Sequence, residues 1–220
     1  MAEWFNLTSA WIPKLSGWSF VRPIKITEQS GNNLSDYQVL IELNSSNFDF
    51  SKAKSDGSDI RFLLPSGKSI PYWIESWDKS GQSAKVWVKV PSIPANSSTV
   101  IYMAYGNPSA SSESNGDAVF EFFDDFEGTS LDTSKWDEID PQNCLTPRVE
   151  NDYLHMDITC SGVQDNSYVC SKNTVTKPSG LGLRMYLKSL KLGEKTSNVW
   201  TIASVRFSSI CSSYIFLNSG

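Results

Sequence analysis

Residues 71–90 read PYWIESWDKSGQSAKVWVKV, and this stretch predicts a β-hairpin. Two short segments rich in aromatic and β-branched residues flank the polar turn DKSGQS, a composition typical of paired strands. Alternation places Val86, Val88 and Val90 on one face of the second strand, with Lys85, Trp87 and Lys89 on the other. We therefore expect the three valines to face a core.

Segments of the same composition lie on both sides of this hairpin. They are FVRPIKIT at 20–27, YQVLIEL at 37–43, IRFLL at 60–64, VIYMAYGN at 100–107, YLHMDIT at 153–159, SYVCS at 167–171, LGLRMYLKSL at 181–190, NVWTIASVRFSS at 198–209 and SSYIFLN at 212–218. Clusters of Gly, Pro, Asn, Asp and Ser separate these segments, and no stretch predicts a helix of three turns. The predicted fold class is all-β, with two antiparallel β-sandwich (jelly-roll-like) domains in tandem.

A polar, Ser-rich stretch suggests where the two domains divide. We expect an apolar N-terminal extension at 1–15, a first sandwich at 16–108, a linker at 109–118 and a second sandwich at 119–220. The second region has about 100 residues, fewer than the roughly 150 of a large two-sheet jelly roll. We therefore expect the second sandwich to be small or truncated.

Composition argues against two classes of partner. The 220 residues carry a formal net charge of −5, and the sequence pI is about 4.9. Nucleic-acid binding surfaces need clustered Lys and Arg, so we expect no nucleic-acid partner. No window approaches the roughly 18 continuous apolar residues of a membrane span, so none is predicted in this chain.

The cysteines favour an oxidising, extracellular setting. They are Cys144, Cys160, Cys170 and Cys211, and none of their spacings is the CxxC of zinc or redox motifs. An even count, together with several Asn-x-Ser/Thr glycosylation sequons, is typical of secreted proteins. Of the three possible connectivities we predict Cys160–Cys170 and Cys144–Cys211, with free thiols as the alternative in a cytosolic protein.

Several motifs in the first half resemble a known family. They are SGWSFVRPIKI, LSDYQVLIEL, SDGSDIRFLLPSGKSIPYWIESWD, VWVKVPSIPA and IYMAYGNPSASS, which together span about residues 16–112. These motifs resemble a β-rich domain of bacterial and archaeal surface proteins that is known only as a domain of unknown function. Its members often precede a concanavalin A-like (laminin G-like) domain, and some bacterial members are fused to MotA/TolQ/ExbB-type proton channel proteins. The resemblance implies a cell-surface location and no particular activity.

The second half resembles a different fold. FFDDFEGTSLDTSKWDEID at 122–140 is similar to the opening strand of a concanavalin A-like lectin/glucanase jelly roll, and VENDYLHMDIT at 149–159 to its second strand. The resemblance implies a structural Ca²⁺, with Asp124 and Asp125 as candidate ligands. A second oxygen-rich loop, Asp56–Asp59, is better interpreted as an Asx turn before a strand.

The glucanases of that superfamily use a glutamate pair and an aspartate on one strand, as E-x-D-x-(x)-E. Here Glu138 and Asp140 begin the pattern, but Pro141 follows and the second glutamate is missing. Proline would also break a central strand. We expect no catalysis at this motif. His155, the single histidine, is expected to be a surface or packed residue.

The hairpin also carries a candidate carbohydrate site. Alternation puts Trp73, Glu75 and Trp77 on one face of its first strand, away from Tyr72 and Ile74. If that face pairs with the outward Trp87, three indole rings and a carboxylate form a stripe on which sugar rings stack. The other register packs Trp73 and Trp77 against the valines as ordinary core, and the sequence leaves both registers open.

The N-terminal segment at 2–15 holds more large apolar side chains than a solvated tail normally does. Those side chains are Trp4, Phe5, Leu7, Trp11, Ile12 and Leu15. The segment packs on its own domain, or it adds as a strand to the open sheet of a neighbouring subunit. Strand addition between copies would build an extracellular fibre.

Taken together, these features predict a non-enzymatic extracellular protein for binding or adhesion at a cell surface. Its expected partner is a carbohydrate or another cell-surface component, with structural Ca²⁺ as the expected cofactor. The alternative is a structural subunit of an extracellular filament or sheath assembled by β-strand exchange. A fragment of a glycoside hydrolase is the third hypothesis.

Overall fold

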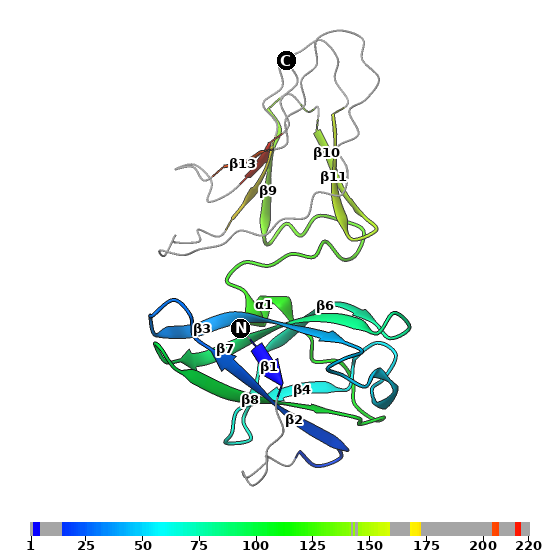
Figure 1. Cartoon of the computed structure of the whole chain (residues 1–220). Coiled ribbons are helices and arrows are strands. Elements are labelled where there is room, and N and C mark those ends of the chain that lie inside the picture. Colours follow the sequence, from blue (N-terminus) through cyan, green and yellow to red (C-terminus); the bar gives the residue numbers. More distant parts are fainter. Residues whose placement is uncertain are drawn as a thin grey trace. The chain divides into compact units, whose positions relative to one another are not determined.

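A computed structural model of the chain describes residues 2–4, 15–141, 143, 145–158, 168–172, 204–206 and 214–216 (Figure 1). The chain divides into two units, Met1–Phe123 and Asp124–Gly220, which are described separately below. The described residues are almost entirely strands and turns, with one short α-helix, so the all-β prediction is confirmed. In this part of the chain no helix is long and apolar enough to cross a membrane.

Unit 1 has two antiparallel sheets. The order in the five-stranded sheet is β1-β2-β8-β4-β5, and the order in the three-stranded sheet is β3-β7-β6. The strands of the first are β1 (Ala2–Trp4), β2 (Phe20–Thr27), β8 (Ser98–Tyr105), β4 (Ile60–Leu63) and β5 (Ser69–Ile70). Those of the second are β3 (Leu34–Asn44), β7 (Ser83–Ile93) and β6 (Tyr72–Asp78). The described part of the unit also contains a 3₁₀ turn, η1 (Phe50–Lys52), and the helix α1 (Gly116–Val119).

The two sheets enclose one core and so form a β-sandwich (Figure 1). Val86, Val88 and Val90 of β7 are all 0 % exposed, which confirms the face predicted for them. The five-stranded sheet contributes buried side chains such as Ile24 and Phe62 to the same cluster. Each fully buried side chain of this size stabilises the fold by roughly 1.5–3 kcal/mol before entropy is counted.

The loop at Asp56–Asp59 is a turn, as predicted. The Asp56 side chain accepts a hydrogen bond from the Ser58 backbone N–H at 3.0 Å, which is an Asx turn. Asp59 does more than close this turn, since its carboxylate is 1 % exposed and accepts from the N–H groups of Lys54 at 2.8 Å and Gly106 at 3.1 Å. It therefore ties the start of β4 to the end of β8.

Strand β1 pairs with its own unit. Ala2 lies opposite Ile26 and Trp4 opposite Ile24 in an antiparallel ladder with β2. For residues 2–4 the structure thus has the self-packed arrangement, one of the two alternatives open from the sequence. The rest of the N-terminal segment, 5–14, lies outside the described residues.

The segment predicted as a linker, 109–118, belongs to unit 1. It runs beside β6, where the Ile74 N–H donates to Ser114 Oγ at 2.8 Å and the Asn115 N–H donates to the Tyr72 carbonyl at 2.9 Å. These bonds cover part of the free edge of β6. The division between the units falls after Phe123 rather than at this segment.

Unit 2 also consists of antiparallel strands where it is described. Its strands are β9 (Trp136–Ile139), β10 (Leu145–Glu150), β11 (Tyr153–Ile158), β12 (Tyr168–Ser171), β13 (Ser204–Arg206) and β14 (Tyr214–Phe216). They form a sheet of order β13-β14-β12-β9 and a separate β10-β11 hairpin. The predicted segment LGLRMYLKSL at 181–190 lies outside the described residues.

The stretch at 122–140, expected to open a concanavalin-like domain, forms a strand only near its end, at β9. Residues 122–128 make bends and irregular structure instead. Asp124 explains part of this, because its carboxylate accepts from the Phe126 N–H at 2.8 Å and from Trp136 Nε1 at 2.6 Å. The chain therefore turns back onto Trp136 instead of extending.

Candidate functional site

The β6–β7 hairpin brings two of the predicted tryptophans together. Trp73 of β6 lies directly opposite Trp87 of β7, and Leu40 of β3 lies opposite Trp87 on its other side. Neighbouring positions pair Tyr72 and Ile74 with the core valines. Trp73 and Trp87 are consequently on the outer face of the sandwich, where both are half-buried.

Trp77 lies on the opposite face, so the prediction that it shares a face with Trp73 is wrong. The register between β6 and β7 shifts between Ile74 and Ser76, which makes Glu75 an extra residue in β6. A bulge of one residue reverses the faces of every side chain after it. Trp77 therefore turns inward, where its ring centroid lies 5.8 Å from that of Phe48.

Glu75 remains close to the outer tryptophans. Its carboxylate accepts a hydrogen bond from Trp87 Nε1 at 2.6 Å, and its side chain is half-buried. Hydrogen bonds to an ionised acceptor are shorter and stronger than neutral ones. Of the four residues predicted to bind sugar, the structure thus brings three together, Trp73, Glu75 and Trp87.

Two phenylalanines complete what we call the outer aromatic cluster, defined as Trp73, Trp87, Phe120 and Phe123. The ring of Phe120 meets Trp73 at 5.9 Å and Trp87 at 5.7 Å between centroids, both edge to face. The ring of Phe123 meets Trp73 at 4.7 Å and is stacked on Phe120 at 5.8 Å. Such geometries are the favoured ones for aromatic pairs.

Helix α1 positions these two rings over the sheet. The Asn115 side chain caps the helix by accepting from the Ala118 N–H at 3.0 Å, and Gln38 Nε2 of β3 donates to the Val119 carbonyl at 3.0 Å. Gly116 allows the close approach of Phe123, because a Cβ at Gly116 would lie 2.2 Å from that ring. Neither phenylalanine was predicted as part of a site, because both fall in the stretch assigned to the second sandwich, 119–220.

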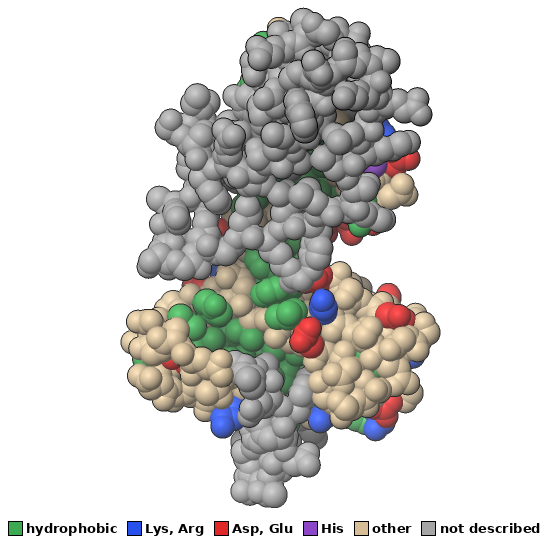
Figure 2. All heavy atoms as spheres, turned by 45° about the horizontal axis from the view of Figure 1, so that its top comes forward, with side chains coloured by type: hydrophobic (Ala, Val, Ile, Leu, Met, Phe, Trp, Pro, Cys, Tyr) green, Lys and Arg blue, Asp and Glu red, His purple; other side chains and the backbone are tan. Residues whose placement is uncertain are grey.

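Hydrophobic side chains also show at the surface of unit 1. On the face drawn in Figure 2 they gather in the middle of the unit, with polar and charged side chains on both sides. The most exposed large hydrophobic residue of unit 1 among those described is Tyr37 of β3, at 47 %. Exposed apolar area bordered by polar residues is typical of interaction surfaces.

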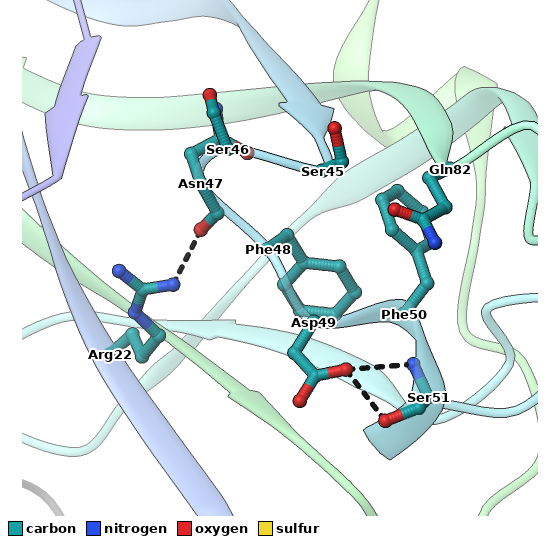
Figure 3. Close-up of a pocket in the computed structure, with 9 residues that line it drawn as sticks. All are labelled: Arg22, Ser45, Ser46, Asn47, Phe48, Asp49, Phe50, Ser51 and Gln82. Atoms are coloured by element: carbon teal, nitrogen blue, oxygen red, sulfur yellow. Dashed lines mark hydrogen bonds between the residues drawn. The ribbon is translucent and has the colours of Figure 1, made fainter.

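A polar pocket of about 340 Å³ lies at the loop between β3 and η1 (Figure 3). The Arg22 guanidinium donates to the Asn47 carbonyl, and the Asp49 carboxylate accepts from the backbone N–H of Ser51 at 3.1 Å and from its hydroxyl at 2.6 Å. The Ser51 hydroxyl, followed by its backbone N–H, lowers the pKa of Asp49 below its usual value. Asp49 thus caps η1, and the aromatic rings beside it belong to the core.

The predicted calcium ligands Asp124 and Asp125 are both half-buried. Asp124 already accepts the two hydrogen bonds described above, and among the described residues no group of three or more His, Cys, Asp or Glu could hold a metal ion. Calcium also binds carbonyl and hydroxyl oxygens, so its presence stays a prediction.

The residues of the incomplete glucanase motif have other contacts. Asp140 accepts from the Leu145 N–H at 2.8 Å and so closes the turn between β9 and β10, while Glu138 is exposed on β9. Nε2 of His155 lies 3.1 Å from the Glu150 carbonyl within the β10–β11 hairpin. Each of these two contacts, of Asp140 and of His155, joins a side chain to a nearby backbone group.

Cys170 lies buried in β12 at 5 % exposure and is disulfide-bonded. The other three cysteines, Cys144, Cys160 and Cys211, fall outside the described residues. The predicted pairing of Cys160 with Cys170 and of Cys144 with Cys211 therefore stays a prediction.

Part of the chain matches the model of a known family. Residues 56–139 match a family described as a domain of unknown function (DUF2341). The matched stretch begins at the Asp56 turn, includes the β6–β7 hairpin and α1, and ends with β9. Searches of curated proteins and of solved structures returned no match to the chain.

Proposed function

We propose that this chain is a non-enzymatic binding and adhesion module of an extracellular surface, and that its ligand is a carbohydrate. The observation that carries the proposal is the outer aromatic cluster. Two indole and two phenyl rings lie on the outer face of the sandwich, where they are half-buried and do not belong to the packed core.

The chemistry of this face suits a sugar. The apolar faces of pyranose rings stack on indole rings, which offer a large rigid surface and lose little conformational entropy. Sugar hydroxyls bind planar polar groups, and the Glu75 carboxylate supplies one beside Trp87. Lys85 and Lys89 flank Trp87 on the same face of β7 and add hydrogen-bond donors.

The test begins with the whole chain on an array of neutral and acidic glycans. Where a glycan gives a strong signal, the affinity of the chain for that oligosaccharide is then measured by titration. Trp87→Leu keeps an apolar side chain but removes the stacking surface, so we expect binding to weaken about tenfold, equivalent to about 1.4 kcal/mol. Trp77→Phe is the matched control, because Trp77 belongs to the same hairpin but faces the core. A chain that binds no glycan would contradict the proposal.

A second candidate function is that of a filament or sheath subunit assembled by strand exchange. The observation in its favour is β1, a three-residue terminal strand at the edge of the five-stranded sheet. The ladder that β1 makes with β2 could equally be made by β1 of another copy, as in domain swapping.

Sedimentation with Ca²⁺ and with EDTA tests this candidate. Exchange predicts large species that disappear when residues 2–15 are deleted. A wild-type chain that remains a monomer in both conditions would instead favour the binding module.

A further inference from the structure

We infer that unit 1 has a second saccharide site, a pocket beside Trp18 on the outer face of the other sheet. This inference rests on the proposed function and adds a site that the outer aromatic cluster does not contain. The pocket measures about 310 Å³ and is lined by Trp18, Arg61, Asn107, Ser109 and Glu113, among others. That volume is at the lower end of the roughly 300–1,000 Å³ of ligand pockets and suits one or two sugar rings.

Trp18 is held in place by packing against the sheet. Its side chain and that of Leu15 pack on Leu63, Tyr102 and Ala104, a small cluster separate from the main core. The backbone N–H of Trp18 donates to the Leu15 carbonyl at 3.2 Å, which closes the turn that carries the ring. Trp18 is only half-buried, so its indole serves as a wall of the pocket as well as a packing group.

Arg61 makes the floor of the pocket rigid. The Arg61 side chain is 7 % exposed, and its guanidinium carbon lies 5.0 Å from the centroid of the Trp18 ring. One of its nitrogens donates to Tyr72 Oη at 3.1 Å and the other to the Ser111 carbonyl at 2.7 Å. A cation over an indole ring is attracted to it, so Arg61 helps to hold Trp18 in place.

Glu113 supplies a carboxylate at the rim. Its Oε1 lies 2.9 Å from Nη2 of Arg61, and its side chain is 61 % exposed. The backbone N–H of Glu113 donates to Tyr72 Oη at 3.3 Å, so the main chain is anchored as well. A carboxylate that is oriented by an arginine and open to solvent can accept hydrogen bonds from sugar hydroxyls without a large loss of side-chain entropy.

Asn107 adds an amide to the lining of the pocket. Its Oδ1 accepts from the Ser109 N–H at 3.0 Å, which orients the side chain and leaves Nδ2 as the donor. Gly17, with φ of +87°, brings the Trp18 turn close to this amide, since a Cβ there would lie 3.3 Å from Nδ2. An aromatic ring held by packing, a carboxylate held by Arg61 and an amide held by the Ser109 N–H thus line one pocket. A neutral pyranose is the ligand class that uses all three.

The experiment uses the full chain and an array of neutral gluco-, manno-, galacto- and xylo-oligosaccharides. The number of molecules bound per chain is then measured by calorimetric titration with the oligosaccharide of strongest signal. Trp18→Leu keeps the apolar packing on Leu63 and Tyr102 but removes the aromatic face, and it should lose one bound molecule per chain. Trp18→Phe should retain that site within about threefold of the wild-type affinity. Glu113→Gln should weaken it at least threefold, with Glu127→Gln, an exposed residue of unit 2, as the matched control.

Three results would overturn the inference. If Trp18→Leu binds as many molecules as the wild type, the pocket is not a site, while the proposed function stands. If Trp18→Phe loses binding as fully as Trp18→Leu, the ring acts through packing and not through stacking. If the wild type binds none of the oligosaccharides, both the pocket and the proposed function fail for neutral sugars.

Discussion

The two faces of the β6–β7 hairpin are built from different side chains and are covered in different ways. The inner face is aliphatic on β7, where Val86 and Val88 are sealed by the opposite sheet, and β6 adds Trp77 to it. The outer face is aromatic, and Trp73 and Trp87 are covered in part by Phe120 from the end of α1. A whole sheet therefore covers the inner face, whereas on the outer face the two indoles are half-buried beside the rings of a short segment.

The comparison also shows how one residue changes a surface. Strand β7 alternates without interruption from Ala84 to Val90, so the inner and outer residues of this part can be assigned from the sequence. In β6 the extra residue Glu75 exchanges the two faces, so that Trp73 is outward and Trp77 inward. The two tryptophans have the same side chain on the same strand, and their roles differ because of the bulge.

The largest expected effect comes from removing the inward ring. Trp77→Ala should lower the free energy of unfolding of unit 1 by about 3–5 kcal/mol, because a large cavity opens against Phe48 and Phe50. Trp77→Phe should cost about 1 kcal/mol, since Trp77 Nε1 is buried without a hydrogen-bond partner among the described residues. Urea unfolding measures both. A smaller loss for Trp77→Ala than for Trp73→Ala would contradict the assignment of faces.

The next effect tests how tightly the outer face is covered. Gly116→Ala should cost about 1–3 kcal/mol, because the new methyl group would overlap the Phe123 ring. In a Phe123→Ala background the same change should cost less than about 1 kcal/mol, since the obstructing ring is gone. A double-mutant cycle by urea unfolding measures the coupling. Additive losses would mean that Phe123 does not pack on Gly116.

A smaller effect follows from uncovering the outer tryptophans. Phe120→Ala removes a ring that contacts both Trp73 and Trp87, and it should cost about 1–2 kcal/mol. The tryptophan emission should move to longer wavelength as the two indoles gain solvent. Tyr37→Ala, at a residue already 47 % exposed, is the control that should leave the emission in place. An unchanged emission maximum in Phe120→Ala would mean that the outer face is covered by something other than Phe120.

The sequence predicted the inner face better than the outer one for a physical reason. Valines in strict alternation are recognised by their period, and burial follows from hydrophobicity alone. A bulge has no such signature, because Glu75 is an ordinary strand residue and only the pairing with β7 shows that it is extra. The prediction that Trp73 and Trp77 share a face was wrong on that account.

The segment at 109–118 was predicted as a linker, and its packing on β6 was missed for a related reason. Its Ser-, Asn- and Gly-rich composition is typical of linkers, yet Ser114 and Asn115 hydrogen-bond to β6 and Gly116 makes room for a ring. Each of these roles depends on what lies next to the residue in space. The Trp18 pocket has the same character, since Arg61 and Glu113 are distant in sequence and meet only in the folded unit.

The smallest effect depends on pH and lies at one end of the sandwich, away from both faces of the hairpin. The Glu28 carboxylate is 7 % exposed, and a hydrogen bond from the Ser30 hydroxyl, followed by those from the backbone N–H groups of Ser30, Asn96 and Gly31, lowers its pKa to about 2. The unfolded chain has an ordinary glutamate pKa of about 4.3. Because the folded pKa is the lower of the two, the carboxylate stabilises the fold fully above about pH 4.3 and loses this contribution as the pH falls toward 2.

Glu28→Gln should therefore be less stable than the wild type at pH 7, and the difference should shrink between pH 4.5 and 2. Urea unfolding across that range measures it, with Glu42→Gln, an exposed residue of β3, controlling for net charge. A difference that stays constant with pH would mean that the side-chain shape of Glu28 matters and its charge does not.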